Sequence, residues 1–139
     1  MIRLYQPDDI TTIEFYPKTA STAMAFGDIV ALSSGYLIDA ISTTPVVLGL
    51  LYKTIAATDS DYALQTRVPV LVPGDNATFL MDVGTGSATQ AVVGLFKDLT
   101  NATSINVNSD TDGIVLITGI ISTTQVIAKF AGKSGVAGG

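Results

Sequence analysis

Short apolar segments alternate with turn-forming residues along most of the chain. Runs rich in Val, Ile, Leu and Thr recur roughly every 8–12 residues and are separated by clusters of Gly, Asn, Asp and Pro. Residues 104–108 alternate strictly between polar and apolar side chains, which is the period of a strand with one buried face. No window has a sustained helical period. The pattern therefore predicts an all-β domain, either a small β-barrel or β-tulip or a sandwich.

Turn residues predict how some of these strands connect. Residues 33–35 (Ser-Ser-Gly) separate two apolar runs, which is typical of a hairpin. Asp112 and Gly113 form a strong turn dipeptide between two further runs. Pro69 cannot donate a hydrogen bond to a neighbouring strand, so residues 68–72 are predicted to form an edge strand or to turn an unpaired side outward at Pro69.

The first 20 residues have a different pattern. Pro7 and Pro17 interrupt any regular helix, and Ile13 and Phe15 alternate as in a strand. Two interpretations fit: an extended arm whose apolar side chains contact a partner, or a first edge strand of the same domain. Because interface anchors are often aromatic, we favour an interface with a partner surface. Its predicted residues are Ile2, Leu4, Tyr5, Ile10, Ile13, Phe15 and Tyr16.

At 139 residues the chain is long enough for one domain with one substantial core. We therefore divide it into an N-terminal arm (residues 1–20), a β-barrel domain (residues 21–131) and a flexible Gly-rich tail (residues 132–139).

Composition argues against an enzyme. The chain has no His, no Cys and no Trp, and its single Glu is Glu14. His is the usual general base and Cys the most ready nucleophile, so their joint absence favours a structural or binding protein without catalytic residues or cofactors.

The charge pattern argues against nucleic acid and membranes as partners. Net charge is −5, and the seven Lys and Arg residues are scattered, without the basic cluster that nucleic-acid binding requires. An acidic surface repels anionic membranes, and the longest apolar run, residues 46–52, is far shorter than the ~20 residues of a membrane span. A weakly charged, Thr-rich surface is typical of a protein that works within an assembly.

One loop matches half of a metal-binding motif. In residues 108–113, Asn108, Asp110 and Asp112 alternate and Gly113 follows, as in the first half of a calcium loop. Gly119 stands where the bidentate acid is needed, so we favour an ordinary Asp-Gly hairpin turn.

Other polar clusters are weaker candidates. Asp59 with Asp61, and Asp8 with Asp9, could supply paired carboxylates, but without a His or a third acid nearby they are expected in solvated or capping loops. Residues 84–87 (Gly-Thr-Gly-Ser) lack the Lys and the helix of a phosphate-binding loop.

Several segments together resemble tailed-phage head decoration (capsid cement) proteins. They cover roughly residues 20–130 in general character rather than through one diagnostic motif. They are Phe26–Leu32 followed by Gly35, Val47–Leu51, Lys53–Ala63, Val68–Val70, Val93–Leu95 and Asp98–Leu99.

The resemblance implies a small β-barrel or β-tulip that binds the outer face of an assembled capsid and stabilises contacts between capsomers. It implies the major capsid protein as partner, a homo-oligomer with a trimer favoured, and a place on the virion surface after synthesis in the host cytoplasm. An N-terminal arm often docks on the capsid, and Ile13 and Phe15 would then project from a strand added to a capsid sheet. The family has no shared catalytic residues.

Two other functions stay open. The first is a virion fibre or spike domain that binds host-surface glycans, in which Tyr36, Tyr52 and Tyr62 would line a concave site. The second is a small hydrolase that uses Asp pairs.

Overall fold

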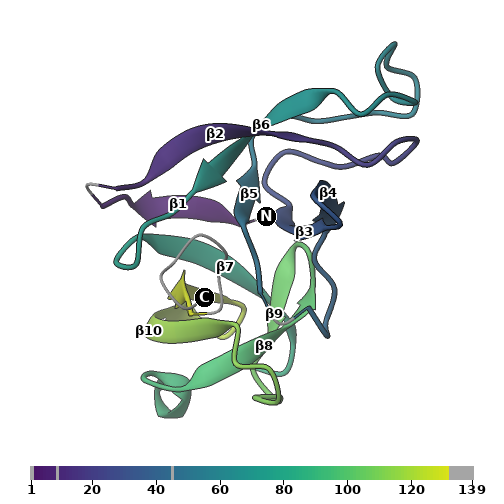
Figure 1. The fold of residues 1–139 in the computed structure, drawn as a ribbon. Coiled ribbons are helices and arrows are strands. Elements are labelled where there is room, and N and C mark those ends of the chain that lie inside the picture. Colours follow the sequence, from purple (N-terminus) through teal and green to yellow (C-terminus); the bar gives the residue numbers. More distant parts are fainter. Residues whose placement is uncertain (1, 9, 45, 132–139) are drawn as a thin grey trace.

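The computed structural model describes residues 2–8, 10–44 and 46–131, and they form two β-sheets (Figure 1). The six-stranded sheet contains β1 (Arg3–Gln6), β7 (Thr78–Thr85), β8 (Phe96–Asn101), β9 (Ser104–Asn106), β10 (Val115–Ser122) and β11 (Gln125–Phe130). The five-stranded sheet contains β2 (Thr12–Pro17), β3 (Ile29–Ser33), β4 (Tyr36–Asp39), β5 (Gly49–Leu51) and β6 (Arg67–Val72). The predicted all-β class is confirmed.

Helix is almost absent from the part of the chain that the structure describes. It is confined there to the 3₁₀ turn η1 (Gln90–Val92). None of the described helical residues belongs to a helix long and apolar enough to cross a membrane.

Strand β7 organises the six-stranded sheet. Along one side it pairs antiparallel with β11. Along the other side its first half pairs with β1, and its second half pairs in parallel with β9. The β7–β9 pairing joins the two ends of the strand order β7-β11-β10-β8-β9, so these five strands form a closed ring with β1 added beside it.

The five-stranded sheet has the order β2-β6-β5-β3-β4 and curls so that its ends meet. Lys18, just after β2, forms a parallel bridge with Leu37 of β4, and the Thr19 N–H donates to the Leu37 carbonyl at 3.3 Å. The predicted β3–β4 hairpin is present, and Ser34 and Gly35 take the positive φ values (50° and 86°) that its tight turn needs.

Two apolar cores hold the sheets. The larger joins the outer face of the five-stranded sheet, with Ile29, Leu50 and Leu71, to ring residues such as Phe79 and Met81. Each such fully buried side chain stabilises the fold by roughly 1.5–3 kcal/mol. The smaller core fills the inside of the curled sheet: Met24, Val30, Leu37, Leu48, Leu51, Ile55, Val68 and Val70.

Of the two alternatives predicted for Pro69, the edge strand is wrong, because β6 lies between β2 and β5. Paired β5 ends at Leu51, and the Pro69 carbonyl still accepts a hydrogen bond from the Tyr52 N–H at 2.9 Å. The missing N–H of Pro69 therefore falls where the neighbouring strand stops.

The described residues among the first 20 do not form a separate arm. Within the described residues 2–8 and 10–20, β1 adds to the six-stranded sheet and β2 to the five-stranded sheet, each as an edge strand. Ile2 belongs to the larger core and Leu4 packs against it, which ties this segment to the domain. The predicted tail, residues 132–139, lies outside the described residues.

Candidate functional site

The seven predicted interface residues do not share one surface. Ile2 is buried, with 1% of its surface exposed, so it contacts the chain's own core rather than a partner. Leu4 and Tyr16 are half-buried and pack against the larger and the smaller core. The four exposed residues are Tyr5, Ile10, Ile13 and Phe15.

Phe15 belongs to a row of apolar side chains that crosses the outer face of the five-stranded sheet. It lies opposite Pro69 of β6. Pro69 in turn lies opposite Tyr52, because its carbonyl accepts a hydrogen bond from the Tyr52 N–H. The centres of the Tyr52 and Phe26 rings are 5.0 Å apart. Opposed residues of antiparallel strands project from the same face. We call Phe15, Pro69, Tyr52 and Phe26 the aromatic strip.

The strip is open to solvent. Phe15 is 56% exposed, Phe26 43% and Tyr52 39%, and Ile13, two residues before Phe15 on the same face of β2, is 44% exposed. Together these side chains expose on the order of 300 Å² of apolar surface, in the range of the largest patches on ordinary monomers. Patches of this kind commonly mark interaction sites.

Local hydrogen bonds fix Phe26 beside Tyr52. The Asp28 carboxylate closes the preceding turn by accepting from the Ala25 N–H at 3.0 Å, and the Phe26 N–H donates to the Thr54 hydroxyl at 3.1 Å. Gly27 takes a φ of 90° and donates its N–H to the Leu51 carbonyl at 2.8 Å. Because the turn is anchored to β5, the backbone that carries Phe26 is held beside Tyr52.

A groove of about 160 Å³ lies at the Tyr52–Phe26 end of the strip, between β1 and the end of β5. Apolar side chains make most of its wall, and Arg3 is its charged member. Its lining residues are Ile2, Arg3, Leu4, Phe26, Gly27, Leu50 and Tyr52.

Both arginines of the chain border the strip. Arg3 lines the groove, and Arg67 projects from the Phe15 face of β6 and donates from Nη1 to the Phe15 carbonyl at 3.0 Å. Glu14 points to the opposite face of β2, because it lies opposite Val70 of the smaller core. The strip thus combines an apolar centre with a positive charge near each end.

The outer edge of β2 is poorly suited to strand addition. The Lys18 N–H donates to Thr66 of the β6 side at 3.0 Å, so by period two Phe15 and Pro17 turn their backbone groups outward. Pro17 has no N–H, and the Phe15 carbonyl already accepts from Arg67. A continuous ladder with a partner strand would be interrupted at both positions, as in protected natural edges.

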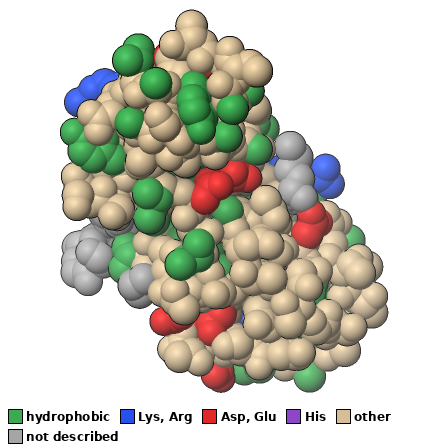
Figure 2. Space-filling view, turned by 90° about the vertical axis from the view of Figure 1, so that its right-hand side faces the viewer, with side chains coloured by type: hydrophobic (Ala, Val, Ile, Leu, Met, Phe, Trp, Pro, Cys, Tyr) green, Lys and Arg blue, Asp and Glu red, His purple; other side chains and the backbone are tan. Residues whose placement is uncertain are grey.

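Figure 2 shows one face of the molecule, on which hydrophobic side chains gather over the upper part while Asp and Glu form separate groups at the centre and the bottom. Lys and Arg appear on this face only at its margins. This face is mostly uncharged, in keeping with the composition.

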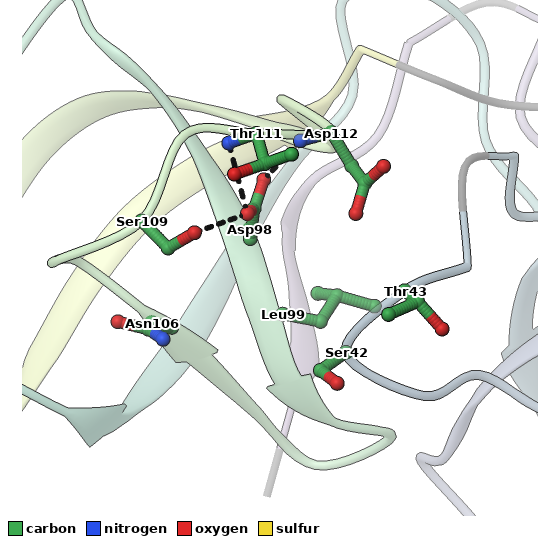
Figure 3. A pocket seen from close by; sticks show the side chains of 8 residues that line it. All are labelled: Ser42, Thr43, Asp98, Leu99, Asn106, Ser109, Thr111 and Asp112. Carbon is green, nitrogen blue, oxygen red and sulfur yellow. Dashed lines mark hydrogen bonds between the residues drawn. The ribbon is translucent and has the colours of Figure 1, made fainter.

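The loop of residues 108–113, which matches half of a calcium motif, is held by hydrogen bonds to the Asp98 carboxylate (Figure 3). Asp98, 4% exposed, accepts hydrogen bonds from the Ser109 hydroxyl and from the N–H groups of Thr111 (3.0 Å), Asp112 (2.8 Å) and Gly113 (2.8 Å). Burial alone would raise the pKa of Asp98, but these hydrogen bonds outweigh it and hold the pKa below its ordinary value.

This arrangement corrects the hairpin prediction for Asp112 and Gly113. The turn leads from β9 to β10, which pair with other strands and not with each other. A polar pocket of about 300 Å³ lies beside it, lined by Ser42, Thr43, Asp98, Leu99, Asn106, Ser109, Thr111 and Asp112. Among the described residues, no three His, Cys, Asp or Glu side chains are grouped as a metal site would need.

A half-buried acid, Asp39, also escaped the sequence analysis. Asp39, at the end of β4, lies beside Asp28, and its Oδ1 is buried without a hydrogen-bond partner among the described residues. Burial, then the negative charge of Asp28 and a hydrogen bond between the two carboxyl groups, raises the pKa of Asp39 to about 7. Asp28 and Asp39 are 11 residues apart in the sequence, and no local pattern connects them, so the sequence carried no signal for this pair.

The remaining candidates have structural roles. Asp59 caps a turn by accepting from the Ala56 N–H at 2.8 Å, and Asp61 pairs with Lys53 at 3.8 Å. Asp8 accepts from the Thr11 hydroxyl at 2.6 Å and from the Asn76 N–H at 3.0 Å. Asp9 and its predicted pairing lie outside the described residues.

The tyrosines of the predicted glycan site do not form one cluster. Tyr52 belongs to the aromatic strip on the outer face of the sheet. Tyr62 packs against the smaller core on the inner face and lies over the buried Lys18 ammonium, 5.7 Å from its ring centre.

A scan of protein-family models and a search of curated proteins found no match to this chain.

Proposed function

We propose that this chain is a structural protein that binds the outer surface of an assembled phage head and stabilises contacts between capsomers. The observation that supports this proposal is the aromatic strip: exposed apolar side chains held in place on a folded sheet, with charge at both ends. Such a surface recognises another macromolecule, because the exposed aromatic and Arg side chains are the types that anchor protein interfaces.

The size of the strip indicates how binding becomes strong. A stable interface buries about 800 Å² on each partner, well above the roughly 300 Å² that the strip exposes. One copy therefore binds weakly. A capsid presents the same site many times, and a homo-oligomer, with a trimer favoured, engages several sites at once with effective concentrations that reach ~mM.

The contact is made by side chains rather than by strand addition. Pro17 and the Arg67–Phe15 hydrogen bond interrupt the outer edge of β2, while Ile13, Phe15, Tyr52 and Phe26 are exposed beside it. The proposed contact is therefore a face of the folded sheet that docks on the capsid, and not an arm that adds a strand to a capsid sheet.

The proposal is tested by mixing the purified protein with heads that were isolated from a phage lacking it, then sedimenting the heads and counting bound copies. We expect saturable binding in a fixed ratio to the major capsid protein, and heads that release their genome at a higher temperature. Wild-type protein that stays in the supernatant would overturn the proposal.

A glycan-binding fibre or spike domain is the second candidate. The exposed Tyr52–Phe26 ring pair favours it, because solvent-facing rings can stack on the apolar face of a sugar. A glycan array separates the two functions: specific glycan binding that is lost in Tyr52→Ala would favour the fibre or spike domain.

A further inference from the structure

We propose that the aromatic strip binds an extended partner segment that places one apolar side chain in the groove and one carboxylate at each end of the strip. This inference rests on the proposed function, and it names the chemistry of the capsid segment that the strip would recognise.

The first argument is the placement of the arginines. The chain has twelve acidic residues and only seven basic ones, yet Arg3 and Arg67, its only arginines, both border this one surface. Among the described residues, neither arginine forms an ion pair. Both side chains are exposed, and Arg67 uses one of its five N–H donors on the Phe15 carbonyl, so most donors remain for a partner.

The second argument is the chemistry of the guanidinium group. Its planar fork matches a carboxylate with two parallel hydrogen bonds, which an ammonium group cannot do. A cation at each end of an apolar patch therefore favours a partner with carboxylates flanking an apolar centre, and disfavours one with Lys or Arg at those positions.

The third argument is length. Neighbouring strands are about 4.8 Å apart, so two steps from Phe15 to Tyr52 span about 10 Å, to which the 5.0 Å between the Tyr52 and Phe26 rings is added. An extended chain covers the resulting ~15 Å with about five residues. A segment of about five residues therefore spans the strip, and we place its two carboxylates near its ends, with an aliphatic residue between them for the groove.

The probe is a pair of synthetic peptides that have the same Leu and Val residues and differ only at two positions five residues apart, which are both Glu or both Lys. Each peptide is titrated into ¹⁵N-labelled protein. Because the chain has two arginines, their two side-chain Nε–H signals report both ends of the strip directly. We expect the Glu peptide to shift both signals and to bind at least tenfold more tightly than the Lys peptide.

Charge reversal provides the matched variants. Arg3→Glu, at an exposed position, should lower the affinity for the Glu peptide at least fivefold. The double variant Arg3→Glu with Arg67→Glu should bind the Lys peptide more tightly than the Glu peptide. Lys97→Glu, on β8 of the other sheet, should change neither affinity. If the double variant does not fold, Arg3→Glu alone decides the matter.

Equal binding of the two peptides, or no shift of either arginine signal, would overturn the inference. Sedimentation with heads separates this result from the proposed function. Heads that bind wild-type protein and Arg3→Glu equally well would contradict the inference alone, whereas failure of wild-type protein to bind heads contradicts the function and leaves the peptide result to decide the chemistry.

Discussion

At the scale of single residues, Asp98 is the most consequential side chain that the sequence left unrecognised. It stands between Lys97 and Leu99 in a short strand, and only the fold shows that it points toward the N–H groups of a loop more than ten residues away. Sequence alone could assign the 108–113 loop to a turn, but it could not show which group holds that turn.

Asp98→Ala should destabilise the protein by about 2–4 kcal/mol, because it leaves three backbone N–H groups and the Ser109 hydroxyl without their acceptor. The folded-state pKa of Asp98 is lowered, so its contribution is present at neutral pH and is lost as the pH falls below the ordinary value of 3.8. Urea unfolding at pH 7 measures the change. Asp110→Ala, at an exposed position in the same loop, should stay within about 0.5 kcal/mol of wild type.

The contribution of Asp39 to the free energy of unfolding should depend on pH in the opposite direction. Its pKa is raised from 3.8 to about 7, so the folded chain binds more protons than the unfolded chain between these values. The free energy of unfolding should therefore be highest, as far as this group is concerned, below pH 4 and should fall as the pH rises toward 7.

Asp39→Asn should remove this fall in the free energy of unfolding with rising pH. At pH 8 we expect a gain of about 1–2 kcal/mol, reduced from the full shift because solvent screens a half-buried group, and at pH 4 little change. Thermal unfolding of wild type and Asp39→Asn across this pH range checks it. Parallel curves for the two proteins would show that Asp39 does not titrate as described.

At the scale of elements, Lys18 connects β2 to the loop before β6. Its side chain is fully buried, and Nζ donates to the Tyr62 carbonyl at 2.6 Å and to the Thr19 carbonyl at 3.1 Å. A buried lysine could not be expected from the sequence, because its partners are two backbone carbonyls and the Tyr62 ring rather than an acid nearby in the chain.

Lys18→Met keeps most of the aliphatic volume but removes the Nζ donor from both carbonyls, and the Tyr62 carbonyl then keeps the Ser21 N–H at 2.9 Å. We expect a loss of about 1–3 kcal/mol and faster amide hydrogen exchange in residues 59–64 than in β10 and β11. Exchange measured by mass spectrometry localises the effect. Uniform acceleration throughout the chain would indicate global destabilisation instead.

The N-terminal strands show where local pattern reaches its limit. Alternating apolar residues between prolines fit a free arm and an edge strand equally well, and the choice depends on whether cores elsewhere in the chain accept Ile2 and Leu4. Deleting residues 1–8 should therefore lower the melting temperature by more than about 10 °C, since it uncovers the larger core. A deletion variant as stable as the full chain would restore the arm interpretation.

At the scale of the whole molecule, the strand-and-turn pattern was sufficient for the all-β class but not for the closure of the sheets. The ring depends on the parallel pairing of β7 with β9, in which Asp82 lies opposite Ser104, and the curled sheet depends on the Lys18–Leu37 bridge. Such pairings join residues about 20 apart that no local signal connects. The aromatic strip was missed for the same reason, since Phe15, Phe26, Tyr52 and Pro69 meet only once β2, β6 and β5 are in register.

We propose the aromatic strip as the surface that engages the phage head, and a matched pair of substitutions tests this most directly. Phe15 and Phe96 are exposed phenylalanines, 56% and 50% exposed, on different sheets. The number of copies bound to heads that lack the protein would be measured for wild type, Phe15→Asp and Phe96→Asp. We predict at least a tenfold lower affinity for Phe15→Asp and wild-type occupancy for Phe96→Asp. Equal binding of Phe15→Asp and wild type would contradict the account.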